Sequence, residues 1–556
     1  MISPPRRSAA SLVFPVLAAC LLVSPARAQH EHEHDHAHEA TEAFGNVHFP
    51  ISCRPELQPA FDRAVAQLHS FAYAAAEQAF ADVAAKDPGC AMAQWGVAMT
   101  HFHVIWGPPT PEEFAAGKAA AEKAAALAAA GATPRERDYV RAIGAYYTGD
   151  NVPHAARVAA FDTAMASVAE HNPNDHEAAI FHALAMLGVA YNSPPDKTYA
   201  RQKQAAEILN RLLPLEPQHP GIAHYMIHSF DYPELAELAL PAARAYSKIA
   251  PSAPHALHMP SHIFTRLGLW HESIESNLAS ARVAREWAAR SHPGAVSFDG
   301  LHAMDYLEYA YLQIGKDAEA RGLVDSVQQA TRFDAAVFQA GYALAMIPAR
   351  YALERRDWKR AAALEVAPAS FPWAQYPYAE ANTHFARALG AARIGDLAAA
   401  RTDVARLEAI RDGLKGQKGF DWATQIEILR REAAAWLARA SKQDDSAVAI
   451  LRSAADLEDA TDKHPVTPGA MLPAREQLAD LLLELGKPRD ALVEYEASLK
   501  NAPARYNTYS GAALAAKRAG DTKKAKDYQD RLLAMCGGTL PQRGTPASGP
   551  RVSGSR

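Results

Sequence analysis

The chain has 556 residues, of which 49% are hydrophobic and 21% are charged, and its formal net charge at pH 7 is −5. A chain of this length and composition can bury a large core, either as several domains or as one long repeat array. The acidic balance argues against a nucleic-acid partner, because proteins that bind nucleic acids present a basic face to the phosphates.

The first residues have the composition of a secretory signal peptide. Arg6 and Arg7 precede a short apolar run at 12–23, and a small-residue cleavage site ends at Ala28. The sequence therefore predicts an exported, periplasmic protein. The alternative is a membrane-anchored lipoprotein with its lipid on Cys20, which ends a segment that resembles a lipoprotein box. No later segment is long and apolar enough to predict a transmembrane helix.

A histidine-rich tract follows the expected cleavage site. Residues 29–40 read QHEHEHDHAHEA, so histidines alternate mostly with acids. Such a composition predicts a disordered leader. Its imidazoles could collect Zn, Cu or Ni, or the leader could simply be solvated.

Two cysteines lie close together early in the mature chain. Cys53 and Cys90 are separated by a loop, whereas Cys536 is far away in the sequence. In an oxidising compartment the first two are predicted to form a disulfide. The alternative is a pair of small buried thiols.

The remainder reads as helix. Alanine-rich stretches with apolar residues at helical spacing are punctuated by Pro, Gly or Asn-Pro, and no segment alternates like a strand. The expected organisation is a signal peptide at 1–28, a disordered leader at 29–45, a helical array at 46–535 and a disordered tail at 536–556.

Short motifs recur within this array. Leu187-Gly188-x2-Tyr191 and Gly268-x-Trp270-x2-Ser273 are two of them, and Leu485-Gly486-x4-Ala491-x3-Tyr495 is followed 34 residues later by Gly520-x4-Ala525. These motifs and their period resemble the tetratricopeptide (TPR) repeat. The phrases CAMAQWGVAM and HALHMPSHIFTRLG also resemble a group of exported bacterial TPR proteins with no established activity.

The resemblance implies a fold and a mode of binding. It implies an all-α, right-handed solenoid of stacked helix pairs. First helices of TPR pairs line a concave groove, which usually holds an extended peptide. The expected function is therefore an exported binding or scaffold protein that engages a peptide or protein in this groove.

The most informative pattern is a repeated pair of histidines. His224 and His228 are four residues apart, as are His258 and His262, and the two pairs are separated by 34 residues. Residues i and i+4 share one face of a helix, so stacked first helices would bring the pairs together. Alignment of three first helices gives these groove positions: Gly221, His224 and His228, then His255, His258 and His262, then His302, Asp305 and Tyr309, with Asp231 extending the first set.

Three interpretations of this cluster stay open. Imidazoles with one of the carboxylates of Asp231 or Asp305 could bind a divalent transition metal such as Zn, Cu or Ni. The histidines could instead bond to water, backbone or a peptide, or they could form a pH-sensitive surface. Pro260 complicates the second pair, because it either kinks a helix or occupies the first turn of one.

Most enzyme motifs are absent from the sequence. There is no HExxH, no GxSxG, no phosphate-binding GxxxxGK[ST] and no GxGxxG after a strand. The sequence thus predicts no nucleotide cofactor and favours a binding protein over an enzyme. The alternative is a metal-handling protein or a metal-dependent hydrolase, with Asp231, Asp305 or Glu308 as the base for a metal-bound water.

Overall fold

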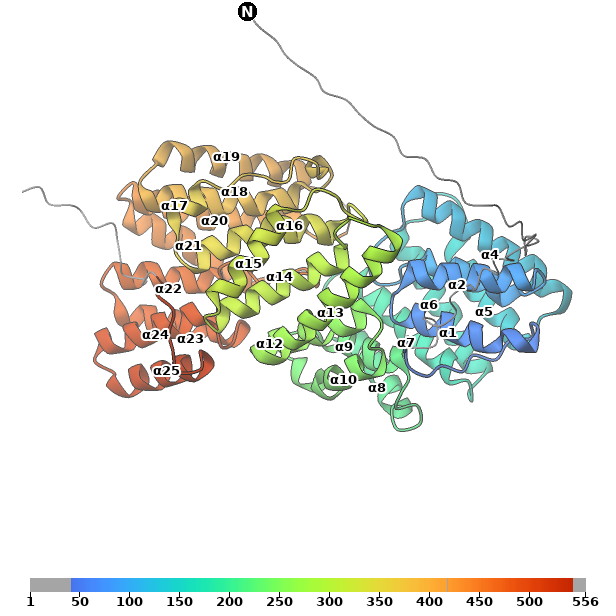
Figure 1. The fold of residues 1–556 in the computed structure, drawn as a ribbon. Coiled ribbons are helices and arrows are strands. Elements are labelled where there is room, and N and C mark those ends of the chain that lie inside the picture. The colour runs from blue at the N-terminus through green and yellow to red at the C-terminus, as the bar shows by residue number, and fades with distance from the viewer. Residues whose placement is uncertain (1–41, 418, 544–556) are drawn as a thin grey trace, which may run out of the picture. The chain divides into compact units, whose positions relative to one another are not determined.

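The computed structural model describes residues 42–417 and 419–543 (Figure 1). The predicted signal peptide at 1–28, Cys20, most of the leader and the end of the tail lie outside these residues. Within them the regular structure is helical, with no strand and only an isolated bridge between Val296 and Phe333. None of the described helices has the length and apolar content needed to cross a membrane.

The helices follow one another in pairs joined by short turns, and each pair packs on the next. The predicted all-α, TPR-like array of stacked helix pairs is therefore confirmed. The N-terminal helices are α1 (Gln58–His69), α2 (Tyr73–Lys86), α3 (Ala91–Thr100), α4 (Pro111–Gly131), α5 (Pro134–Tyr147), α6 (His154–His171), α7 (His176–Tyr191) and α8 (Ala200–Leu212), preceded by the 3-10 helix η2 (Pro55–Leu57).

The central helices carry the histidine pattern. They include α13, which is longer than its neighbours. Their bounds are α9 (Pro220–Phe230), α10 (Ala236–Ile249), α11 (Pro254–His258), α12 (Pro260–Leu267), α13 (Trp270–Ser291), α14 (Phe298–Gln313) and α15 (Asp317–Gln328).

The C-terminal helices continue the same pattern, with one very short second helix at α17. Their bounds are α16 (Phe338–Glu354), α17 (Trp358–Ala362), η3 (Trp373–Gln375), α18 (Pro377–Ile394), α19 (Leu397–Leu414), α20 (Trp422–Ala440), α21 (Asp444–Ala460), α22 (Ala474–Glu484), α23 (Pro488–Asn501), α24 (Tyr506–Ala519) and α25 (Thr522–Met535).

Glycines end several first helices, as the repeat motifs predict. Gly268 caps α12 with φ 69° and Gly395 caps α18 with φ 89°. This left-handed conformation costs glycine least, and it lets the backbone N–H groups after the helix bond to the last free carbonyls. The sequence therefore marks the turn within each pair locally.

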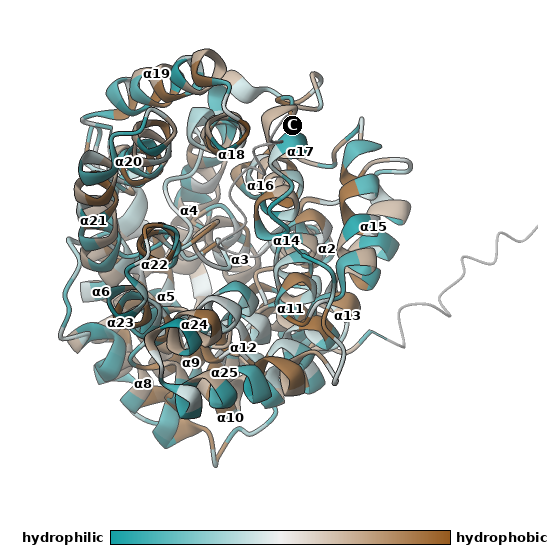
Figure 2. Cartoon of the chain, turned by 90° about the vertical axis from the view of Figure 1, so that its left-hand side faces the viewer, coloured by the Kyte–Doolittle hydropathy of each residue, from teal (hydrophilic) through white to brown (hydrophobic). Residues whose placement is uncertain are grey.

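The core is built from small and large apolar side chains between the helices. Figure 2 shows apolar and polar residues on the same outer helices, such as α13 and α15, as expected when one face of a helix is buried. One apolar cluster runs from Phe44 to Phe264 and a second begins at Trp270 and Leu301. The histidine-bearing helices lie where the first cluster meets the second.

Contacts between distant segments join the C-terminal pairs to the central ones. The indole Nε1 of Trp270 donates to the carbonyl of Ala504 at 2.7 Å. Arg505 donates to the hydroxyl of Tyr309 at 2.8 Å and to Glu354 at 2.7 Å. Residues around 505 therefore pack on α14 and its neighbours.

The packed chain extends past both expected boundaries of the array. Phe44, within the predicted leader, is buried, and the backbone N–H of Ala43 donates to Ser252 Oγ at 2.8 Å. At the other end Arg543 pairs with Asp317 and lies over the ring of Tyr506 at 4.2 Å. The expectation of disorder is thus wrong for residues 43–45 and 536–543, because these side chains find partners on the array.

Candidate metal centre

The six histidines predicted to line the groove form two adjacent groups rather than one cluster. Two of them lie on α9, two on α11, one on α12 and one on α14. We call His258, His262 and His302 the buried triad, and His224, His228 and His255 the outer triad. In each triad one nitrogen of every ring lies within 4.8 Å of the others, and no Asp or Glu belongs to either group.

Pro260 divides the first helix of this repeat into α11 and α12. Pro260 occupies the first turn of α12, and Met259 between the helices keeps a right-handed helical conformation with φ −52° and ψ −36°. The helix is therefore interrupted at Pro260, but α12 continues from α11 without a non-helical residue between them. His258 and His262 keep facing each other across the break, as a helical i, i+4 pair would.

In the buried triad two ring nitrogens meet directly. The Nε2 atoms of His258 and His262 are 3.0 Å apart. The ring of His302 lies 4.2 Å from that of His258, centroid to centroid. Three imidazoles from three helices thus converge on one point.

The other nitrogen of each facing ring already has a fixed partner. His262 Nδ1 donates to Asp231 Oδ2 at 2.9 Å, because a carboxylate can only accept. His258 Nδ1 donates to Asn277 Oδ1 at 2.7 Å. The amide of Asn277 is oriented by its own Nδ2, which donates to the carbonyl of Ser273 at 2.7 Å.

These partners determine the state of the two facing nitrogens. A neutral imidazole carries one N–H, and in His258 and His262 that hydrogen is on Nδ1. Both Nε2 atoms therefore present lone pairs to each other at 3.0 Å. Such an arrangement is repulsive unless a cation, either a proton or a metal ion, lies between them.

The surroundings disfavour a proton. Burial, together with the charge of His262, lowers the pKa of His258 to about 3. Burial also lowers the pKa of His262, although Asp231 opposes the shift. Neutral imidazoles are the form that ligates metals, so the environment prepares these rings as ligands.

A segment from the C-terminal half covers the buried triad. The ring of Tyr306 contacts all three histidines, and its hydroxyl donates to the carbonyl of Pro465 at 3.3 Å. Lys463 in the same segment is half-buried, and desolvation with the charge of Arg266 lowers its pKa to about 7. The sequence pattern did not indicate this segment, which lies between α21 and α22.

The outer triad is built in a similar way. His224 Nε2 lies 3.1 Å from Nε2 of both His228 and His255. His224 Nδ1 donates to the backbone carbonyl of His69 at 2.6 Å, so Nε2 of His224 is also a bare lone pair. Five of the six histidines are buried, whereas His255 is partly exposed.

The two triads are close enough to influence each other electrostatically. Burial is the main cause of the lowered pKa of His255, and the charges of His224, His258 and His262 lower it further. Burial and the charges of His258, His262 and His255 do the same for His302. Positive charge on one triad therefore disfavours positive charge on the other.

The two carboxylates predicted as ligands do not join the triads. Asp231 bonds to His262 through Oδ2 and to Arg266 through Oδ1 at 2.9 Å, so it orients a ligand instead. Burial alone would raise the pKa of Asp231, but Arg266 and Lys463 outweigh it and keep the carboxylate ionised. Asp305 is paired with Arg350 at 2.7 Å.

Glu308, a predicted candidate for a catalytic base, is also bound to Arg350, at 2.9 Å. Burial raises the pKa of Glu308 to about 8 despite this partner. All three candidate bases are therefore bound to arginine side chains, which sequence spacing could not reveal.

Tyr309, predicted to line an open groove, is buried. Its hydroxyl accepts a hydrogen bond from Arg505, and Trp270 lies against its ring with centroids 5.4 Å apart. The prediction fails because the C-terminal repeats pack onto α14.

A third group of ligand-type residues was missed by the sequence pattern. His69, Glu177 and His219 come from α1, α7 and the start of α9. Glu177 accepts from Nε2 of His69 at 2.9 Å and from Nε2 of His219 at 2.8 Å. Nδ1 of His69 accepts from Tyr225 and Nδ1 of His219 accepts from the N–H of Gly221. Every ring nitrogen thus has a protein partner, and this group is a complete hydrogen-bond network.

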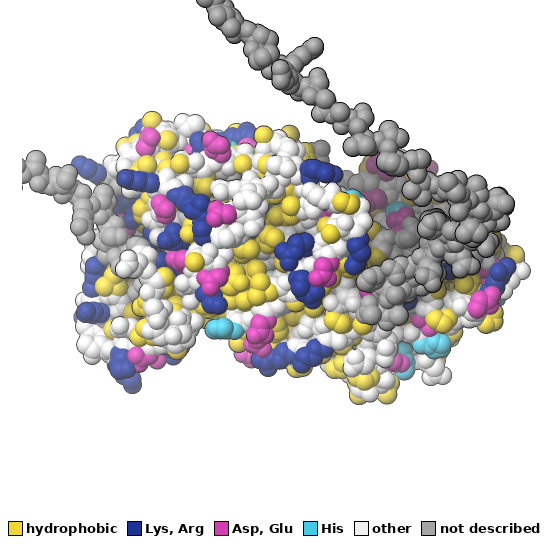
Figure 3. All heavy atoms as spheres, in the orientation of Figure 1, with side chains coloured by type: hydrophobic (Ala, Val, Ile, Leu, Met, Phe, Trp, Pro, Cys, Tyr) yellow, Lys and Arg dark blue, Asp and Glu magenta, His cyan; other side chains and the backbone are white. Residues whose placement is uncertain are grey.

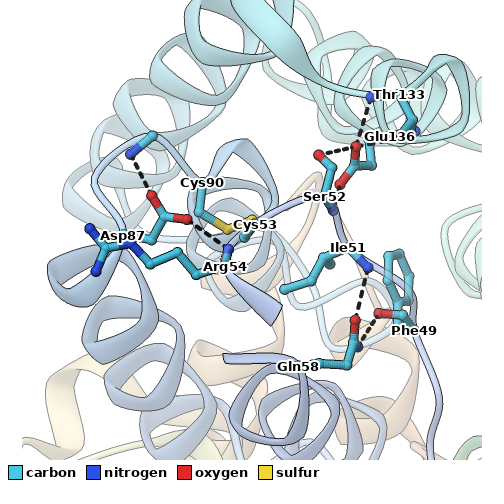
Figure 4. Close-up of a disulfide and its surroundings, with 11 residues drawn as sticks. Phe49, Ile51, Ser52, Cys53, Arg54, Gln58, Asp87, Cys90, Thr133 and Glu136 are labelled. Atoms are coloured by element: carbon cyan, nitrogen blue, oxygen red, sulfur yellow. Dashed lines mark hydrogen bonds between the residues drawn. A yellow bond between two sulfur atoms is a disulfide. The ribbon is translucent and has the colours of Figure 1, made fainter. Parts of the chain in front are cut away.

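Cys53 and Cys90 form a disulfide in the structure, with their Cα atoms 5.1 Å apart (Figure 4). Cys90 is the N-cap of α3 and Cys53 lies just before η2. Neighbouring hydrogen bonds hold the same segment: the N–H of Arg54 donates to Asp87 at 3.0 Å. The cross-link joins the segment that precedes η2 to the start of α3, and its formation in an oxidising compartment stays a prediction.

The face shown in Figure 3 has Lys and Arg side chains interspersed with Asp and Glu, and few histidines. That distribution agrees with the burial of the clustered histidines. It also gives this face no continuous basic patch of the kind that a nucleic acid would require.

Comparisons with known proteins add little to this description. No protein-family model matches the sequence, and no curated protein matches it either. Among solved structures, a monomeric mutant of IFIT1 with Gppp-AAAA is 12% identical and has a TM-score of 0.38, covering 87% of this chain and 96% of its own.

Two further structures are similarly distant. The APC/C hetero-tetramer Cut9–Hcn1 is 12% identical, with a TM-score of 0.30, and the match covers 87% of this chain and 94% of that one. The TPR domain of P58(IPK) is 12% identical, with a TM-score of 0.22 and coverage of 84% and 99%. The chain's own helix pairs and histidines therefore describe it: it is a helical-repeat protein with three groups of residues that could hold a metal ion, one of which, the Glu177 group, is already satisfied by hydrogen bonds.

Proposed function

We propose that this chain is an exported helical-repeat metalloprotein whose buried triad binds a first-row transition metal, with Zn, Cu and Ni as candidates. One observation carries the proposal. The Nε2 atoms of His258 and His262 face each other at 3.0 Å while their Nδ1 atoms donate to Asn277 and Asp231.

The donor set fits this class of metal. Three neutral imidazoles are borderline nitrogen ligands, which suit Zn, Cu and Ni better than the oxygen-preferring Mg or Ca. The acceptors on Nδ1 match the outer-shell partners that orient histidine ligands and raise their basicity. Three protein ligands also leave a coordination position for a further group, as in catalytic zinc sites.

The surrounding network supports the distinction between ligands and structural histidines. His69 and His219 share Glu177 through assigned N–H donors and need no cation. His258 and His262 lack such a partner on Nε2. The same fold thus contains a histidine group that is satisfied by protein alone and another that is not.

A peptide in the concave groove, the function implied by the repeat resemblance, has less support at this position. The histidines expected to contact the peptide are buried, and Pro465 accepts a hydrogen bond from Tyr306 above them. Peptide binding elsewhere on the array is a separate proposal. A metal-dependent hydrolase would have to free Asp231, Asp305 or Glu308 from its arginine partner, or use a different base.

The test is metal content in the full exported chain with the histidines of residues 29–40 replaced by serine. That replacement removes the only other histidine-dense segment apparent in the sequence. After incubation with Zn²⁺ and gel filtration, we expect stoichiometric zinc in this parent protein. A His258→Ala, His262→Ala variant should lose the ion that the buried triad holds.

The matched control changes a histidine of a separate network. A His384→Gln variant should keep the metal, because His384 on α18 bonds to Asp403 and Glu380 and belongs to neither triad. Circular dichroism of each variant checks that the helices are retained. A parent protein that holds no zinc, copper or nickel after loading would overturn the proposal.

A further inference from the structure

We infer that the outer triad binds a second transition-metal ion beside the first, and that this second ion is the exchangeable one. The inference rests on the proposed function, because it assigns a partner ion to the same centre. It follows from the contacts of His224, His228 and His255, which are independent of those in the buried triad.

The outer triad has the convergence expected of a metal site. Nε2 of His224 is within 3.1 Å of the Nε2 atoms of two other rings. Because its Nδ1 donates to the carbonyl of His69, this Nε2 offers a single lone pair to both neighbours. With their hydrogens on Nδ1, His228 and His255 would each add an Nε2 lone pair, and an ion at the point where the three Nε2 atoms converge would bind all three.

The acceptor on His224 is itself held in place. The carbonyl belongs to His69 at the end of α1, and the His69 ring is fixed by Glu177 at 2.9 Å and by Tyr225 at 2.8 Å. The complete hydrogen-bond network therefore supports the outer triad from behind. Such outer-shell anchoring is a regular feature of histidine ligands.

A single short helix connects the two triads. His255 and His258 are three residues apart on α11, so they lie on the same face about one turn from each other. The first contributes to the outer triad and the second to the buried triad. Two ions held by these triads would therefore be linked through one turn of α11.

Access differs between the two sites. The buried triad is covered by Tyr306 and the segment around Pro465, whereas His255 in the outer triad is partly exposed. Aromatic side chains from two loops form the wall on the exposed side. Phe71 stacks on His255 with centroids 5.6 Å apart, and Trp106, itself 38% exposed, lies 5.7 Å from the same ring.

The wall also contains a conformationally strained position. Phe71 has φ 54°, in the left-handed region that bulky side chains avoid. Strain of this kind persists where the surrounding structure determines it and is frequent at ligand sites. The position keeps the Phe71 ring against the outer triad, close to His224 at 4.4 Å.

The experiment counts zinc ions per chain and measures their release. The protein is the full exported chain with the histidines of residues 29–40 replaced by serine, loaded with Zn²⁺ and passed through gel filtration. We expect two ions in this parent and one in a His224→Gln, His228→Gln variant. His255→Ala, a change at the partly exposed position, should also leave one ion while disturbing the core least.

Release into excess EDTA distinguishes the two sites. The His258→Ala, His262→Ala variant retains the outer ion, and the His255→Ala variant retains the buried ion. We expect EDTA to remove the outer ion at least tenfold faster than the buried ion. Release rates that are equal, or in the opposite order, would contradict the assignment of the outer ion as exchangeable.

The outcomes separate this inference from the proposed function. A parent with one ion that survives His255→Ala but is lost in His258→Ala, His262→Ala overturns the second site and leaves the first intact. A parent with one ion that is lost in His255→Ala but survives His258→Ala, His262→Ala overturns the proposed buried site, and with it the proposal of two neighbouring ions. A parent with no ion overturns both.

Discussion

Nδ1 of His262 donates a hydrogen bond of 2.9 Å to Oδ2 of Asp231, a residue 31 positions earlier in the chain. This contact joins the end of α9 to α12 and fixes which nitrogen of His262 is free. Asp231 is thereby an orienting residue for the buried triad, and its effect on metal binding can be measured.

Asp231→Asn should weaken zinc binding by roughly 10–100-fold, the range found when outer-shell partners of metal ligands are changed. The substitution preserves shape but removes the negative charge that makes His262 more basic. Zinc affinity would be measured by competition with a chromophoric chelator in the chain that lacks the leader histidines.

The matched control is Asp403→Asn. Asp403 accepts from His384 Nδ1 at 2.8 Å in the same manner but belongs to α19, far along the chain from the triads. Its replacement should leave zinc affinity unchanged. Equal affinities for Asp231→Asn and the parent would show that Asp231 does not orient a ligand.

Arg505 links the C-terminal repeats to the central ones through fully buried ion pairs. It donates to Glu354 at 2.7 Å and Glu476 at 3.0 Å, and also to the hydroxyl of Tyr309. Arg505→Met should lower the free energy of unfolding by about 3–5 kcal/mol, because two carboxylates lose a buried partner. Urea denaturation followed by circular dichroism measures the change.

An exposed arginine provides the comparison. Arg489→Ala on α23 should change the free energy of unfolding by less than about 0.5 kcal/mol, as is usual at the surface. If Arg505→Met were as harmless as Arg489→Ala, the buried network would contribute nothing to the packing of the repeats.

His384 should make stability depend on pH. Burial alone would lower its pKa, but hydrogen bonds to Asp403 and Glu380 outweigh burial and raise the pKa above 6.5. Arg387 and Arg406 also pair with these carboxylates. A histidine with a raised folded-state pKa contributes its stability fully below the unfolded pKa and loses it as pH rises through the folded pKa.

His384→Gln should therefore cost more at pH 5.5 than at pH 9. At pH 5.5 the loss should be roughly 1.5 kcal/mol, the lower end for hydrogen bonds to charged groups, and at pH 9 it should be clearly smaller. Urea midpoints of the parent and variant at both pH values give the comparison. A larger loss at pH 9 than at pH 5.5 would contradict the assignment.

The Cys53–Cys90 disulfide should form in an oxidising compartment and stabilise the N-terminal repeat. Closing a loop across a separation of 37 residues contributes about 3–4 kcal/mol in the chain-entropy model. Peptide mapping without reduction should find the two cysteines linked, and Cys53→Ser, Cys90→Ser should unfold at lower urea concentration. Cys536→Ser is the control, and two free thiols in protein taken from the oxidising compartment would refute the prediction.

The sequence by itself determined the helical array, the ends of several helices and which helices are equivalent. Glycines at 268 and 395 end helices because left-handed caps favour glycine, and the period of 34 places His224 and His258 on equivalent helices. The i, i+4 spacing put His258 and His262 on one face even across the break at Pro260. Helix ends, helix faces and the repeat period depend only on the order of residues along the chain, so they can be read from the sequence.

Only the tertiary structure decided how the histidines divide and which nitrogens are free. Asn277, Asp231 and the carbonyl of His69 supply the acceptors that commit Nδ1 of His258, His262 and His224. Their distances along the chain follow no repeat period, so spacing could not indicate them. Arg505 likewise converts Tyr309 from an expected groove residue into a buried one. A proton's position on an imidazole depends on which acceptor the folded chain brings to it, and that information exists only once the helix pairs have packed.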